Sequence, residues 1–220
     1  MTRALFPELV LQDPEAGARM LERVFGFSGH GQELRLGSQR LLVSGGEPDR
    51  RHGRIDHLAL SVPEVPVALA ECVAREGRLS SATPDGPLTI PEFWEAGVDY
   101  VFLDGPEGSK VELIARKPPA PQAEWGHDHV GISCADLRPM REFFLGLGLE
   151  ERAAVTLDRP EGRVDVAFLA WGDDVVELYC LPETRADPSL NGGAGFWRRL
   201  RAEGIERRQV GPEGVEILPL

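Results

Sequence analysis

The chain has 220 residues, of which 42% are apolar and 27% charged, and its formal net charge is -12. This composition is typical of a globular protein with a hydrophobic core. The acidic balance argues against nucleic acid as a partner, because affinity for a phosphate backbone depends on Lys and Arg. No apolar run approaches the roughly 20 residues of a membrane helix, and the N-terminal stretch meets acid and proline too early for a signal peptide, so a cytoplasmic protein is expected.

Four related modules follow one another along the chain. The first three each begin with a strand-like run, which is followed by apolar residues at helical spacing and then by further short strand-like runs. The fourth is truncated: it has a predicted helix over 193–205 and a final strand, but no opening strand. The modules are predicted at 4–50, 54–117, 126–182 and 190–220.

Stretches rich in proline, glycine and charge mark the boundaries between modules, at 45–53, 117–126 and 181–193. Module 2 also contains an insertion, 83–97, that has no counterpart in module 3. Phe93 and Trp94 in this insertion are predicted either to cover a pocket as a lid or to pack against the outside of the sheet.

One histidine and one glutamate recur at matching places in modules 2 and 3. The strand-like runs IDHLALSV and HDHVGISC carry the histidines, and SKVELIAR and DDVVELYC carry the glutamates. These residues are His57, His129, Glu112 and Glu177. Side chains alternate along a strand, so each has a fixed direction. Imidazole and carboxylate groups are ligands of divalent transition metals, and a carboxylate inside an apolar run is costly without a cation.

Each histidine could instead be an ordinary half-buried strand residue that is hydrogen-bonded to the backbone. The repeat in matching slots favours a metal over that interpretation. Asp56 and Asp128 precede the two histidines and are predicted to point to the opposite face, toward solvent or a sheet edge.

The weaker repeats place two further acids in related slots. Glu8 occupies the slot of the two histidines, and Glu216 occupies the slot of Glu112; both are predicted to be exposed rather than metal ligands. The three cysteines are odd in number and widely spaced, which suits neither disulfides nor a zinc knuckle. Cys72, Cys134 and Cys180 are therefore predicted to be buried free thiols.

This order of elements, with histidine on the first strand of a module and glutamate on the last, resembles the vicinal oxygen chelate superfamily. The superfamily includes glyoxalase I, bleomycin and fosfomycin resistance proteins, and extradiol dioxygenases. The resemblance implies an α+β fold of repeated βαβββ modules that form two barrel-like, half-open sheets. The sequence order His, Glu, His, Glu is similar to that of glyoxalase I. It implies a metal held by His57, Glu112, His129 and Glu177, with Glu177 or Glu112 as the catalytic proton shuttle.

The function implied is that of a metal-dependent lyase or isomerase acting on a small oxygenated substrate, with Ni, Zn, Mn, Co or Fe as the metal. Two alternatives stay open: an iron-dependent extradiol dioxygenase, which fits less well because that class uses a single glutamate ligand, and a metal-free protein that sequesters a ligand. Modules pair either consecutively, 1 with 2 and 3 with 4, or in nested order, 2 with 3 and 1 with 4. Nested pairing is preferred because it collects all four ligands in one site. A monomer is expected, since four modules in one chain remove the need to dimerise.

Overall fold

The computed structural model describes residues 4–48, 53–118, 124–191, 193 and 195–220. The predicted boundaries at 45–53, 117–126 and 181–193 therefore each lie partly outside the described residues. Two compact units make up the chain: unit 1 consists of Met1–Val10, Pro48–Asp56 and His129–Leu220, and unit 2 of Leu11–Glu47 and His57–Asp128. Because the division falls inside three strands, neighbouring residues such as Asp56 and His57 belong to different units.

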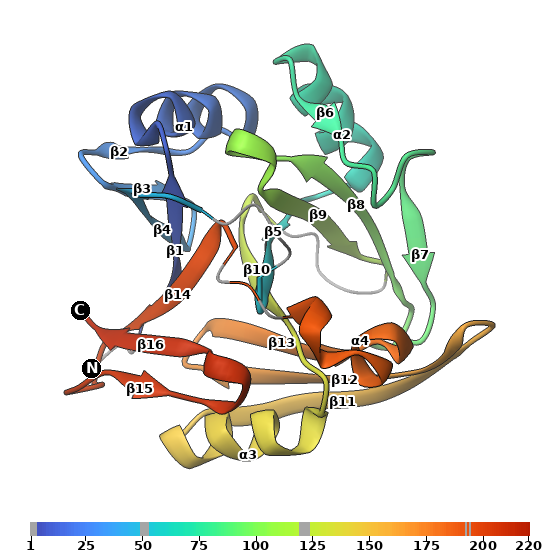
Figure 1. The fold of residues 1–220 in the computed structure, drawn as a ribbon. Coiled ribbons are helices and arrows are strands. Elements are labelled where there is room, and N and C mark those ends of the chain that lie inside the picture. Colours follow the sequence, from blue (N-terminus) through green and yellow to red (C-terminus); the bar gives the residue numbers. More distant parts are fainter. Residues whose placement is uncertain (1–3, 49–52, 119–123, 192, 194) are drawn as a thin grey trace. The chain divides into compact units, whose positions relative to one another are not determined.

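Unit 2 contains two groups of strands and two main helical segments (Figure 1). The first group has the order β4-β3-β2, and the second has the order β5-β9-β8-β6, with β7 paired to β8. The elements are α1 (Pro14–Met20), continued by η1 (Leu21–Phe25), β2 (Ser28–His30), β3 (Glu33–Leu36), β4 (Gln39–Gly45), β5 (Ile55–Ser61), α2 (Val65–Ala74), β6 (Arg78–Leu79), β7 (Leu88–Ile90), β8 (Val98–Asp104), η2 (Pro106–Gly108) and β9 (Lys110–Arg116).

Unit 1 also contains two groups of strands, in the orders β15-β16-β14-β1 and β11-β12-β13-β10. Helix α3 lies along the second group and contacts β12 and β13 (Figure 1). The elements are β1 (Leu5–Leu11), β10 (Gly126–Ser133), α3 (Leu137–Leu147), β11 (Glu150–Arg159), β12 (Gly162–Trp171), β13 (Asp174–Cys180), α4 (Pro182–Ala186), η3 (Pro188–Asn191), β14 (Trp197–Ala202), β15 (Gln209–Val210), η4 (Pro212–Gly214) and β16 (Glu216–Pro219).

The ends of α3 follow from its sequence. Asp136 caps the N-terminus, where its carboxylate accepts a hydrogen bond of 3.0 Å from the backbone amide of Arg138. Met140 and Phe144, four residues apart, are buried on the face toward the sheet. Gly148 ends the helix with φ of 99°, a conformation that costs little only for glycine, as the predicted glycine-containing turn requires.

The sequence repeat Gly-Pro-Glu-Gly folds into the same turn in both units. Glu107 in η2 and Glu213 in η4 have φ angles of 55° and 53°. Each glutamate accepts a hydrogen bond of 2.9 Å at the entry to a helix, Glu107 from the backbone amide of Asp13 before α1 and Glu213 from that of Ala135 before α3. The two turns therefore have the same structural role, because each is hydrogen-bonded to the entry of a helix in its own unit.

The helix predicted over 193–205 is wrong. Residues Trp197–Ala202 form strand β14, which pairs antiparallel with β1 and parallel with β16. Trp197 and Leu200 are buried and three residues apart, a spacing that also fits a helix face. Pairing on both sides of the strand satisfies its backbone groups and decides the outcome, so module 4 does have an opening strand.

Strand β11 was not predicted, because its sequence gives a weak signal. Its residues are mostly exposed, and charges interrupt the apolar alternation. It is held by a long antiparallel ladder with β12. The predicted α+β fold class is confirmed: the strand groups mix parallel and antiparallel pairs, and helices are few among the described residues. The division into modules and their pairing stay predictions.

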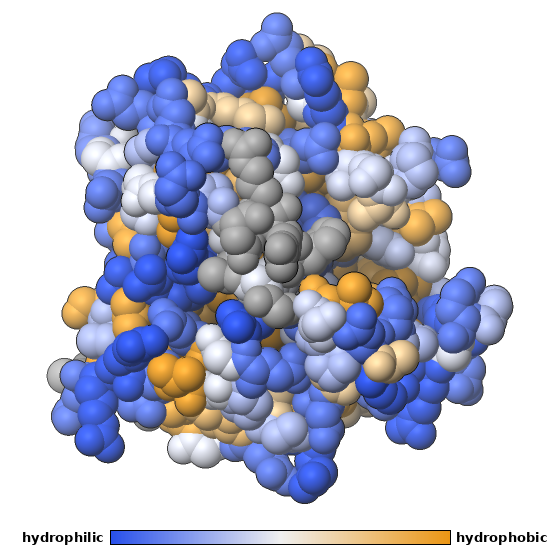
Figure 2. Space-filling model, viewed as in Figure 1, coloured by the Kyte–Doolittle hydropathy of each residue, from blue (hydrophilic) through white to orange (hydrophobic). Residues whose placement is uncertain are grey.

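Figure 2 shows a face on which hydrophilic side chains dominate and apolar ones are scattered among them. Among the helices of the described residues, none is both long and apolar enough to cross a membrane.

Candidate metal centre

In unit 2, parallel pairing places one predicted histidine beside one predicted glutamate. Glu112 on β9 lies opposite Ala59 on β5, and His57 lies two residues before Ala59 on the same face. The His57 Nε2 and Glu112 Oε2 atoms are 3.3 Å apart, and both side chains are buried.

Unit 1 repeats this arrangement on different strands. Glu177 on β13 lies opposite Gly131 on β10, and His129 lies two residues before Gly131. The His129 Nε2 and Glu177 Oε2 atoms are again 3.3 Å apart, and both side chains are again buried. The same register therefore produces the same pair twice, each within its own unit.

The donor chemistry and the spacing within each pair fit a metal. A charge-assisted hydrogen bond between nitrogen and a carboxylate is usually about 2.7 to 2.9 Å long, which is shorter than the distance seen here. Two ligand atoms that are each about 2.1 Å from one ion lie roughly 3.0 to 3.4 Å apart at tetrahedral or octahedral angles. Each buried pair, taken by itself, therefore offers one imidazole and one carboxylate to a metal ion.

Comparison with known proteins gives a fold and no closer relative. No protein-family model matches the sequence, and no curated protein matches it. Solved structures do match. Glyoxalase I from Zea mays has a TM-score of 0.66 at 14% identity, over 99% of this chain and 92% of that chain. A candidate dioxygenase from Bacillus subtilis has a TM-score of 0.61 at 12% identity, over 97% of this chain and 84% of that chain.

The chain has the same fold as glyoxalase I. In this fold, a phenylalanine accompanies each pair. Phe102 lies opposite Glu112 on β8, and its ring meets the edge of the His57 ring with centroids 5.1 Å apart. Phe168 lies opposite Glu177 on β12, and its ring centroid is 5.9 Å from that of His129. Each phenylalanine lines the face on which the donors lie.

Sequence reasoning missed these two phenylalanines. The signal was present, because the third strands of modules 2 and 3 contain the aligned triplets Val-Phe-Leu and Ala-Phe-Leu. Only a comparison of the two strands, rather than a search for metal ligands, would have found them.

The prediction that Glu8 is exposed is wrong. Its side chain is buried, and it accepts hydrogen bonds from Arg201 Nε and an Arg201 terminal nitrogen at 2.9 and 2.8 Å, with Arg199 Nε at 3.6 Å. Glu216 is half-buried and paired with Arg208. Both acids therefore lie in slots related to the donor positions but are paired with arginine.

The prediction that Asp56 faces solvent is also wrong. Asp56 is buried and is hydrogen-bonded to Tyr179. Burial raises the pKa of Tyr179 well above its ordinary value, and the charges of Asp56 and Glu177 add to that effect. Asp128 is half-buried. The three cysteines are free and buried, as predicted.

The insertion in module 2 packs against its own unit. Phe93 is buried, and the Arg116 guanidinium lies over the Trp94 ring, 3.9 Å from its centroid. Trp94 has φ of 56°, which is rare for an aromatic residue. These contacts match the packing alternative, and the lid stays a prediction.

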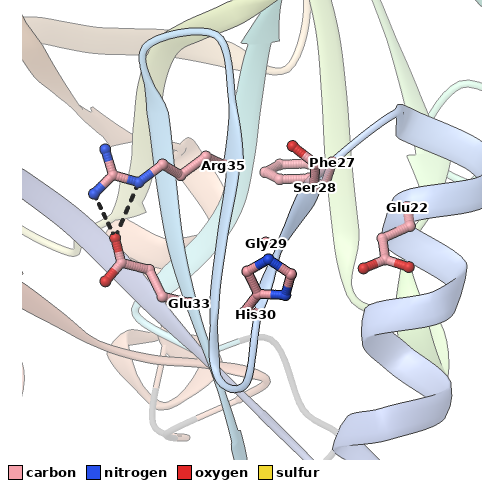
Figure 3. Close-up of a pocket in the computed structure, with 7 residues that line it drawn as sticks. All are labelled: Glu22, Phe27, Ser28, Gly29, His30, Glu33 and Arg35. Atoms are coloured by element: carbon pink, nitrogen blue, oxygen red, sulfur yellow. Dashed lines mark hydrogen bonds and ion pairs between the residues drawn. The ribbon is translucent and has the colours of Figure 1, made fainter.

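A separate pocket of about 780 Å³ in unit 2 has little metal-binding chemistry (Figure 3). It is lined by Glu22, Phe27, Ser28, Gly29, His30, Glu33 and Arg35. Burial raises the pKa of Glu33, but hydrogen bonds and charges from Arg35 and Arg40 outweigh it and hold that pKa below its usual value. Because arginine already neutralises Glu33, and His30 is the one imidazole among the lining residues, this pocket is a poor metal site.

Proposed function

We propose that this chain is a metal-dependent lyase or isomerase of the glyoxalase type, in which His57, Glu112, His129 and Glu177 bind one divalent metal ion. The observation that carries the proposal is the repeated buried pair, with the same strand register and the same 3.3 Å separation in each unit. The histidine, the glutamate and the aromatic neighbour recur together in one register, which supports a common chemical role for the two pairs. The metal is one of Ni, Zn, Mn, Co or Fe, since imidazole and carboxylate suit all five.

A bound divalent ion would supply a Lewis acid that polarises an oxygen atom of the substrate. The chain supplies the proton transfer: Glu177 or Glu112 takes a proton from one carbon of a small oxygenated substrate and returns it to the neighbouring carbon. Both carboxylates are buried beside an imidazole, which fixes their position for proton transfer. Phe102 and Phe168 flank the donors and exclude water from that face.

Elemental analysis of the freshly purified protein tests the proposal. We expect one equivalent of a divalent transition metal in the wild-type protein and loss of that metal in both His57→Ala and Glu177→Ala. Loss of a residue that only hydrogen-bonds to a metal ligand already weakens metal affinity about 10- to 100-fold, so removal of a ligand itself should weaken it at least as much. Glu216→Ala is the matched control, because its carboxylate pairs with Arg208, and it should keep the metal.

The variants also test whether the two pairs share one ion. His57 belongs to unit 2 and Glu177 to unit 1, so a shared ion requires both variants to lose it completely. Retention of the metal in either variant would contradict the proposal, and a wild-type protein without metal would favour a ligand-sequestering protein. Ferrous iron together with oxygen consumption on catechols would favour the extradiol dioxygenase.

A further inference from the structure

A second pocket, of about 670 Å³, lies within unit 1 beside the start of α3. This volume is in the range of small-molecule pockets. Four arginines and two aspartates are among its lining residues, together with Thr156 and Cys180. In a chain whose net charge is -12, a concave site where arginine outnumbers acid is a local exception.

The polar side chains of this pocket lie on the face of the sheet opposite the candidate metal ligands of unit 1. Thr156, Asp165 and Cys180 are register neighbours on β11, β12 and β13. Phe168 is the register neighbour of Glu177 and lies three residues after Asp165. Because side chains alternate along a strand, an odd separation puts the two sets on opposite faces. The pocket is thus distinct from the His129–Glu177 pair.

One carboxylate holds two of the arginines in place. Asp165 accepts hydrogen bonds from Arg163 Nε at 2.7 Å, from Thr156 Oγ1 at 2.9 Å and from an Arg185 terminal nitrogen at 3.0 Å. Arg185 also donates to the backbone carbonyl of Arg163 at 3.1 Å. Each guanidinium has five N–H donors, so both retain donors beyond those that Asp165 and its neighbours use. The arrangement orients two forks and leaves part of each for a ligand.

The remaining charges of the pocket divide clearly. Arg141 donates through two nitrogens to Glu151 and is committed to that acid. Arg138 has a weaker partner, because its guanidinium is 3.7 Å from Glu142 and both side chains are exposed. The second lining aspartate is Asp136, which caps α3. Arg163 and Arg185 therefore share Asp165, and Arg138 lines the pocket with Glu142 as its exposed partner.

We propose that this pocket binds the phosphate group of a small molecule. Guanidinium groups match phosphate oxygens through paired hydrogen bonds, and Arg163 and Arg185 are pre-oriented by Asp165 to make such pairs. Arg138 adds a third cation. A doubly charged phosphate interacts with three arginines more favourably than a single carboxylate does. The pocket also has volume for the organic part of a phosphate monoester.

Isothermal titration of the full chain with inorganic phosphate and with AMP tests the proposal, with chloride at matched ionic strength as the blank. We expect saturable binding of both anions, and AMP should bind more tightly. Arg163→Gln and Arg185→Gln should each weaken binding about tenfold or more, since hydrogen bonds to charged groups are the strong ones. Arg163→Lys should bind phosphate little better than Arg163→Gln, because lysine keeps the positive charge but lacks the paired N–H donors of the guanidinium.

Matched controls keep the test specific. Arg19→Gln removes an exposed arginine of unit 2 and should leave phosphate binding unchanged. His57→Ala should also leave phosphate binding unchanged, and the pocket variants should keep their metal content. The phosphate proposal and the metal proposal are therefore tested separately. If Arg185→Gln does not fold, Arg138→Gln replaces it, because that side chain is 76% exposed. Absence of saturable binding, citrate binding as tight as that of AMP, or binding that survives the arginine variants would overturn the proposal.

Discussion

Two parallel strand pairs in unit 1 share one geometry and differ in the groups that accompany a carboxylate. In the pair β10–β13, Glu177 lies opposite Gly131 and close to His129. In the pair β14–β16, Leu200 lies opposite Ile217, so that Trp197 takes the slot of the histidine and Glu216 the slot of the glutamate. One pair carries metal-binding donors, and the other carries a buried indole and an acid paired with arginine.

Glu8 makes the same contrast on the neighbouring strand. It lies in a histidine slot on β1, next to β14, and Arg201 neutralises it with two hydrogen bonds. A buried carboxylate needs a cation in either place. Arginine supplies this cation at one pair of strands, and the contrast supports the proposal that a metal ion supplies it at the other.

The largest effect is expected from removing the arginine that neutralises Glu8. Arg201→Met leaves a buried carboxylate without its main partner and should lower the free energy of unfolding by about 3 kcal/mol. Urea denaturation measures this change. The double variant Glu8→Leu, Arg201→Met should recover most of the loss, because neither charge then remains.

A matched control for Arg201→Met is Arg208→Met. Arg208 is 60% exposed, and its pair with Glu216 is near the surface, so this change should cost less than about 1 kcal/mol. If the two arginine variants lose the same stability, burial does not distinguish the Glu8–Arg201 pair from the Glu216–Arg208 pair. The contrast drawn above would then be wrong.

The same contrast explains what could be predicted from the sequence. His57, Glu112, His129 and Glu177 were found because each interrupts an apolar strand at a matching place. Their pairing within each unit follows from the register of the parallel strands, which only the structure shows. The sequence could not show that the acid in the related slot of β1 is buried, because its arginine partner is 193 residues away.

The errors have physical causes that act at a distance. Trp197 and Leu200 have helical spacing, and only pairing with β1 and β16 makes their segment a strand. Strand β11 is mostly exposed and carries charges, so its ladder with β12, rather than its own pattern, defines it. Residue patterns predicted the strands that have one buried face. They failed for strands whose conformation depends on pairing with a partner strand.

A smaller effect is expected from the phenylalanine beside the proposed metal ligands. Phe168→Leu removes the ring that contacts the edge of His129 and should weaken metal binding about tenfold, as loss of a group that orients a ligand usually does. Competition with a chromophoric chelator measures the affinity. Leu169→Val is the matched control, because it changes a buried residue on the opposite face and should lower stability without changing metal affinity. Equal losses of affinity in both variants would assign the effect to general packing.

The smallest effect compares the two Gly-Pro-Glu-Gly turns. Glu213→Ala removes the acceptor for the backbone amide of Ala135 and for the side chain of Asn191, both partly buried, and should cost about 1 to 2 kcal/mol of unfolding free energy. Glu107→Ala removes one exposed acceptor, that for Asp13, and should cost about 0.5 kcal/mol. Urea midpoints at unchanged m-values measure both. The two turns have the same backbone, so burial of the helix entry is the difference that is tested. If Glu107→Ala lowers the free energy of unfolding as much as Glu213→Ala or more, burial does not determine how much the turn stabilises the protein.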